Sequence, residues 1–186
     1  MTRLHTSWNF NKWIIESHLD NFEELRKFIP EKKDNRQIET ATNGGYQYYY
    51  SDTEIGEAAD FVRARVNTLL EEHEAPIRAG ALSKSWSIQY DPGGWQAMHN
   101  HAMPYKIITV VLNFSDRVGE DTSEGAFYAM LPDVDGSAEV KVFPHWAGKL
   151  IIAEGNIFHG SYPCHDERDI MVFDFHQEIM NDAIGQ

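Results

Sequence analysis

Hydrophobic residues in the first third of the chain recur every three or four positions, which is typical of amphipathic helices. Leu19, Phe22 and Leu25 follow this spacing, and Pro30 ends the run. A short Gly-Gly turn and a tyrosine-rich stretch over residues 44–50 then predict a turn followed by an exposed strand.

A longer helical pattern begins at Ser51 and Glu54, which have the spacing of a capping box. Pro76 and Gly80 close it. The apolar positions that predict this helix are Ile55, Ala59, Val62, Val66 and Leu69 or Leu70. Its charged positions predict a solvated face.

From residue 83 the pattern changes to short β-rich runs separated by turn signals such as Asp91-Pro92-Gly93-Gly94. Strands without intervening helices are typical of an antiparallel sandwich or a small barrel. We therefore expect one domain over residues 1–186, mainly β, with a mainly helical support region over 1–82 and a β core over 83–186. The predicted strands cover residues 83–90, 105–114, 125–131, 138–143, 149–153 and 169–176.

Composition limits the partners. The 186 residues include 16 Lys and Arg against 29 Asp and Glu, which gives a net charge of −13. Nucleic acids and anionic membranes attract basic proteins, so we expect neither as a partner. A small molecule, a peptide or a protein remains as the expected substrate.

The cellular setting follows from what the sequence lacks. Cys164 is the one cysteine, so no intramolecular disulfide can form, and we interpret it as a structural thiol rather than a nucleophile. No apolar run approaches the ~20 residues that span a bilayer. The first residues have no signal-peptide pattern, and a cytoplasmic location is the expectation.

Three histidines are candidates for metal ligands. His99 and His101 stand two residues apart, and on an extended chain such residues share a face. His159 follows a Gly155-Asn156 turn after the strand predicted over 149–153. Imidazole binds divalent iron, zinc, copper or nickel, and three ligands on one side leave coordination positions open for substrates.

Arg168 stands nine residues after His159, immediately before the predicted strand 169–176. A guanidinium can bind a carboxylate through two parallel hydrogen bonds. A metal with open positions beside such an arginine would hold a chelating keto acid.

The segment Tyr90-Asp91-Pro92-Gly93-Gly94-Trp95-Gln96-Ala97-Met98-His99-Asn100-His101 resembles the start of the double-stranded β-helix in the Fe(II)/2-oxoglutarate-dependent oxygenases. Residues 148–175 resemble the part of those enzymes that carries the second metal histidine and the 2-oxoglutarate arginine. The small, often phage-associated members are the most similar. The resemblance covers about half of the chain and implies a jelly-roll, cupin-like barrel.

The resemblance also implies an activity and residue roles. His99, His101 and His159 would bind Fe(II), and Tyr90 and Arg168 would hold 2-oxoglutarate. The reaction would be hydroxylation of a C–H bond in a peptide side chain or small molecule, with release of succinate and CO2. His101 stands where this family has a carboxylate, so the usual two-histidine, one-carboxylate site becomes a three-histidine site.

Two alternatives stay open at this point. Gly93, His99 and His101 also satisfy part of the cupin spacing, which would make the protein a cupin-like metalloprotein with a three-histidine site and no 2-oxoglutarate. The acidic ligand that cupins supply a few residues later is absent from 102–105. The second alternative is that the histidines lie on a solvated strand and bind no metal.

Overall fold

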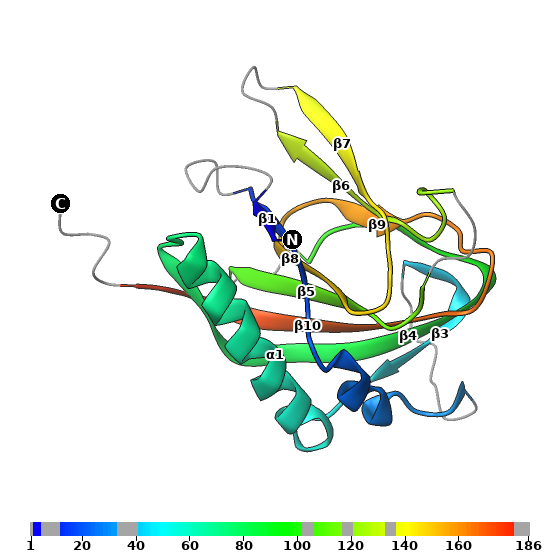
Figure 1. Ribbon diagram of the computed structural model, residues 1–186, viewed down its shortest axis with the longest axis horizontal. Helices are drawn as coiled ribbons and strands as arrows, with labels where there is room; N and C mark the ends of the chain where they lie inside the picture. Colours follow the sequence, from blue (N-terminus) through cyan, green and yellow to red (C-terminus); the bar gives the residue numbers. More distant parts are fainter. Residues whose placement is uncertain are drawn as a thin grey trace.

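The computed structural model describes residues 2–4, 12–32, 41–101, 106–116, 121–132 and 137–180. Within these ranges ten strands form one curled antiparallel sheet in the order β1-β2-β8-β5-β10-β4-β9-β6-β7, with β3 paired to β4 (Figure 1). The strands are β1 (Arg3–Leu4), β2 (Ile14–His18), β3 (Thr42–Tyr49), β4 (Ile77–His99), β5 (Ile107–Asn113), β6 (Phe127–Pro132), β7 (Ala138–Phe143), β8 (Lys149–Glu154), β9 (His159–Ser161) and β10 (Arg168–Ile179).

The long helix α1 (Asp52–Glu72) covers the outer face of the sheet, where it lies over β4 and β10 (Figure 1). The predicted capping box is confirmed, because Glu54 accepts hydrogen bonds from the Ser51 backbone N–H at 2.7 Å and from its hydroxyl at 2.6 Å. The buried stripe matches the predicted apolar positions and adds one alanine: Ile55, Ala58, Ala59, Val62, Val66, Leu69 and Leu70.

The central strands are buried on both faces, and successive residues divide between two cores. On β10, Met171, Phe173 and Phe175 pack in the cluster that contains α1. Ile170 and Val172 point to the other face, into a second cluster inside the curl of the sheet. This two-sided burial explains why β10 and β5 are almost continuously apolar, and it places the few polar residues on the inner face where they can form a site.

Three parts of the chain differ from the predicted elements. β4 continues through the predicted turn at 91–94, because Gly93 adopts φ +84° and β3 pairs with the strand on both sides of the bend. β9 pairs with β4 after the bend. The helix predicted near residues 19–27 is a 3-10 helix, Phe22–Phe28. The short strands β2 and β9 have no counterpart in the predicted pattern; each is held by pairing to a distant partner, β8 or β4 and β6.

None of the helices in the described ranges combines the length and the apolarity that crossing a bilayer requires. The observed fold class is mainly β with one covering helix. The β core agrees with the strands that the sequence predicted from residue 83 onward.

Candidate active site

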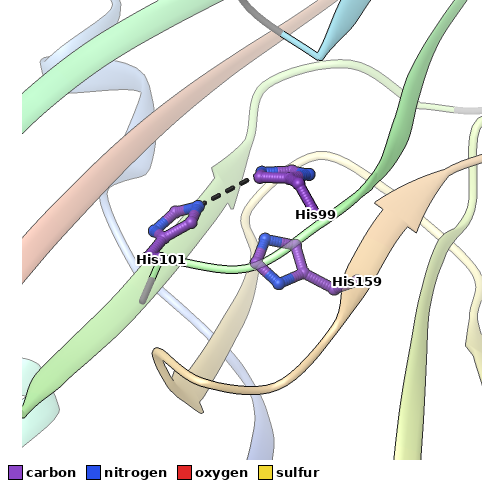
Figure 2. A group of neighbouring side chains, drawn as sticks. All are labelled: His99, His101 and His159. Carbon is purple, nitrogen blue, oxygen red and sulfur yellow. Dashed lines mark hydrogen bonds between the residues drawn. The ribbon is translucent and has the colours of Figure 1, made fainter. Parts of the chain in front are cut away.

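Three histidine side chains converge inside the curl of the sheet (Figure 2). His99 ends β4, His101 follows it, and His159 begins β9 directly opposite His99 in the strand register. One ligand atom from each residue lies within 4.8 Å of the other two. The His99 and His101 rings meet through their Nε2 atoms at 3.2 Å. The structure therefore brings together the three residues that the sequence analysis predicted as metal ligands.

Hydrogen bonds at the opposite ring nitrogens fix which atoms are available. The Nδ1 of His99 bonds the Ala97 carbonyl at 2.8 Å, and the Nδ1 of His159 bonds the Ile157 carbonyl at 2.8 Å. A carbonyl only accepts, so each Nδ1 carries the hydrogen and each Nε2 presents a lone pair. In metal sites the same arrangement orients histidine ligands.

The Nε2 atoms of His99 and His101 are close enough to bind the same cation. His101 also has an acceptor at its Nδ1, the Asp174 carboxylate at 2.8 Å, so in the neutral form of both rings the Nε2 lone pairs of His99 and His101 point toward each other. Two nitrogen ligands about 2.1 Å from one ion and at right angles lie about 3 Å apart. The donor set therefore fits a divalent metal ion.

Burial favours the neutral form of His99 and His159, which is the form that binds metal. The pKa of His159 lies well below the usual histidine value, mainly because the ring is desolvated and secondarily because His101 and His99 are close. Burial also lowers the pKa of His99.

Arg168, the first residue of β10, is buried in the same pocket, with 3% of its surface exposed. It donates to the Ser161 hydroxyl at 2.8 Å and to the Gly125 carbonyl, and its guanidinium lies 4.4 Å from the centre of the Tyr90 ring. Among the residues that the structure describes, none forms a hydrogen bond with its Nε. In the described part of the chain no carboxylate forms an ion pair with Arg168, although buried charges are normally paired. The pocket is therefore suited to an anionic ligand.

Strand β9 connects the two parts of the pocket. His159 and Ser161 lie two residues apart on one strand, so their side chains share a face and their Cα atoms are about 6.7 Å apart along the strand. One end carries the metal-ligand candidate, and the other carries the hydroxyl that contacts Arg168. A short dicarboxylate could reach from a metal ion to Arg168 across this distance.

Tyr90 supports the arginine from β4. Its hydroxyl donates to the Gln96 side chain at 3.0 Å, and Thr42 donates to the same oxygen at 2.8 Å. Burial raises the pKa of Tyr90, so the hydroxyl stays protonated. The structure thus places the ring of Tyr90 against the guanidinium while its hydroxyl belongs to a buried polar network.

Sequence reasoning missed three residues of the site: Ser161, Thr109 and Asp174. Each is a polar residue with little exposed surface on an inner strand. The available signal was a polar residue inside an apolar strand, which for Asp174 is the run Ile170-Met171-Val172-Phe173-Asp174-Phe175. Cys164 is buried and contacts backbone carbonyls, and burial raises the pKa of its thiol, as suits a structural residue.

No protein-family model and no curated protein sequence matches the chain. Solved structures do match. A prolyl hydroxylase from Trichoplax adhaerens, in complex with a hypoxia inducible factor oxygen degradation domain peptide fragment, is 14% identical with a TM-score of 0.61, over 92% of this chain and 87% of that one. An oxidoreductase of the 2OG-Fe(II) oxygenase family from Burkholderia pseudomallei is 14% identical with a TM-score of 0.62, over 83% and 78%.

HygX from Streptomyces hygroscopicus, with nickel and 2-oxoglutarate bound, is 11% identical with a TM-score of 0.61, over 88% of this chain and 82% of that one. The fold is that of the Fe(II)/2-oxoglutarate oxygenases. The fold that the sequence resemblance implied, a jelly-roll barrel, is thereby confirmed.

Proposed function

We propose that the protein is an Fe(II)- and 2-oxoglutarate-dependent oxygenase that hydroxylates a C–H bond of a peptide side chain or small molecule and releases succinate and CO2. The observation that carries the proposal is a buried arginine without a carboxylate partner among the described residues, in the same pocket as three converging imidazoles. The oxygenase fold of the similar structures supports it.

The proposed roles follow from the contacts. His99, His101 and His159 would hold the metal, and Arg168, with Ser161 and the Tyr90 ring, would bind the remote carboxylate of 2-oxoglutarate. Bound iron and 2-oxoglutarate would supply the oxygen-activating chemistry. The protein itself would bind and orient these two groups. It would also exclude water, because Ile88, Val111 and Val172 form apolar walls of the pocket.

The substrate class is proposed on charge and analogy. A net charge of −13 disfavours a polyanionic substrate. One structure of the same fold holds a peptide fragment, which supports a peptide as one candidate substrate. A small molecule is the other.

A cupin-like metalloprotein that does not use 2-oxoglutarate is the second candidate. The observation in its favour is the set of three neutral ligands, which departs from the two-histidine, one-carboxylate site of non-haem iron oxygenases. In this alternative Arg168 would bind a different anion or none.

One experiment tests the proposal. The protein is loaded anaerobically with Co(II), whose absorption spectrum reports its coordination, and 2-oxoglutarate is added. In parallel, succinate formation is measured under air with Fe(II). We expect a spectral change on addition of 2-oxoglutarate and succinate production that depends on Fe(II). A Co(II) spectrum that 2-oxoglutarate never perturbs, together with no succinate, would favour the cupin-like alternative.

A further inference from the structure

Asp174 lies on the inner face of β10 among apolar residues, and none of its surface is exposed. One carboxylate oxygen, Oδ1, accepts from the His101 Nδ1 at 2.8 Å and from the Thr109 hydroxyl at 2.8 Å. The second oxygen, Oδ2, has no hydrogen-bond partner among the described residues, and the Lys84 ammonium lies 3.6 Å from it. His101 is therefore held from behind by a buried acid.

This burial needs compensation that the described side chains supply only in part. Lys84 is beyond hydrogen-bonding distance and its side chain is 39% exposed, so water weakens its attraction to Asp174. Thr109 contributes a dipole but no charge. A buried carboxylate with so little positive charge around it points to a cation on the far side of the His101 ring.

The other two candidate ligands differ from His101 in this respect. His99 and His159 bond main-chain carbonyls, which are neutral. Of the three, only His101, the residue at the position where the oxygenase family has a carboxylate, has an anion behind it.

We infer that Asp174 supplies the negative charge that the three-histidine centre lacks, acting through His101 as a positioning residue. The inference rests on the metal site of the proposed function. A dication with three neutral imidazoles and one carboxylate behind them carries one net positive charge. A dication bound directly by two imidazoles and a carboxylate carries the same charge. A carboxylate that contacts a ligand instead of the metal therefore conserves the net charge of the centre, while a third imidazole takes its place on the metal.

The first test is Asp174→Asn, which keeps the shape and removes the charge. We expect the affinity for Co(II), measured by anaerobic titration, to fall 10–100-fold, the range typical of such outer partners of metal ligands. Asp169→Asn is the matched control, because Asp169 lies on the same strand, is partly exposed and pairs with Arg26 at 3.6 Å instead. The control should bind Co(II) as tightly as the wild type.

The second test distinguishes a charge role from a merely structural one. In His101→Asp the acid is restored to the metal, and Asp174 becomes a like charge beside it. Adding Asp174→Asn to that variant should then strengthen Co(II) binding, whereas the same change weakens it in the wild type. A structural role predicts a loss in both backgrounds. The comparison between the single and double variants also decides the question if Asp174→Asn alone fails to fold.

The outcomes separate this inference from the proposed function. Wild-type protein that binds no Co(II) or Fe(II) would overturn both. Wild-type protein that binds metal, with Asp174→Asn equal to it or with a loss in both backgrounds, would overturn the role of Asp174 and leave the proposed function standing.

Discussion

Arg168 donates a 2.8 Å hydrogen bond to the hydroxyl of Ser161, whose side chain shares a strand face with His159. The contact ties the start of β10 to the short strand β9 and so fixes the distance between the guanidinium and the histidine cluster. Because β9 also pairs with β4 at His99, this spacing is built into the sheet and does not depend on a flexible loop.

The first prediction concerns Arg168. Arg168→Ala should keep metal binding and lose 2-oxoglutarate binding, at a cost of about 2–5 kcal/mol for a buried charge pair. Arg168→Lys should recover only part of the affinity, since an ammonium lacks the planar fork of donors. Titration of the Co(II)-loaded variants with 2-oxoglutarate measures both. Equal affinity in Arg168→Ala and the wild type would remove Arg168 from the ligand site.

The second prediction concerns the metal ligands. His99→Ala or His159→Ala should abolish Co(II) binding at concentrations that saturate the wild type, because each removes one of three converging nitrogens. His165→Ala is the control, since the side chain of His165 is 69% exposed and lies outside the cluster. One bound ion per chain in both ligand variants would show that the metal binds elsewhere.

The third prediction concerns the bend of β4, which lies between Tyr90 and His99. Gly93 has φ +84°, and no heavy atom lies within 4 Å of the position that a Cβ would take there, so Gly93→Ala should cost about 1–2 kcal/mol from backbone strain alone. At Gly94 a Cβ would overlap the carbonyl oxygen of Gly44 and crowd the carbonyl oxygen of Asp91. Both are backbone atoms, which cannot rotate away. Gly94→Ala should therefore cost more, about 3 kcal/mol or above.

Urea unfolding of the two glycine variants measures the difference. The Co(II) affinity of Gly94→Ala should fall as well, because the bend sets where His99 ends the strand. A smaller loss of stability in Gly94→Ala than in Gly93→Ala would contradict the close approach of β3 and β4 at this point.

The fourth prediction concerns the start of α1. Hydrogen bonds from Ser51 and Tyr48 lower the pKa of Glu54 to about 2. A carboxyl whose pKa is lower in the folded state stabilises the fold at pH values above its unfolded-state pKa of ~4.3. This contribution disappears as the pH falls toward 2. Glu54→Gln should therefore lower the melting temperature at pH 7, and the difference from the wild type should shrink on acidification. A difference that stays constant with pH would mean that the charge of Glu54 contributes nothing.

The elements that the sequence predicted best are those with local signals. The capping pair Ser51 and Glu54 and the regular apolar spacing identified α1. The turn residues separated most of the predicted strands, although β4 continues through the turn predicted at 91–94. His99 and His101 could be paired from sequence because residues two apart on an extended chain share a face. Arg168 could be added through its distance from His159 and the family resemblance.

The parts that escaped prediction depend on pairing between distant strands. Asp174 lies behind His101 only because β10 is paired to β5 and β4 in one register, which sets Asp174 opposite Thr109 and Lys84. A shift of one residue would turn its side chain toward α1. Ser161 likewise reaches Arg168 through the pairing of β9 with β4 and β6, and no local pattern encodes that register.

The anchoring of the three imidazoles has an evolutionary consequence. Two of them are fixed by carbonyls that every residue type possesses, so substitutions at Ala97 or Ile157 leave those anchors in place. The third is fixed by the side chains of Asp174 and Thr109, which a single codon change can replace. Selection can therefore retune the electronic character of one ligand while the other two continue to hold the ion, and positions 109 and 174 are where such adjustment is to be sought in related sequences.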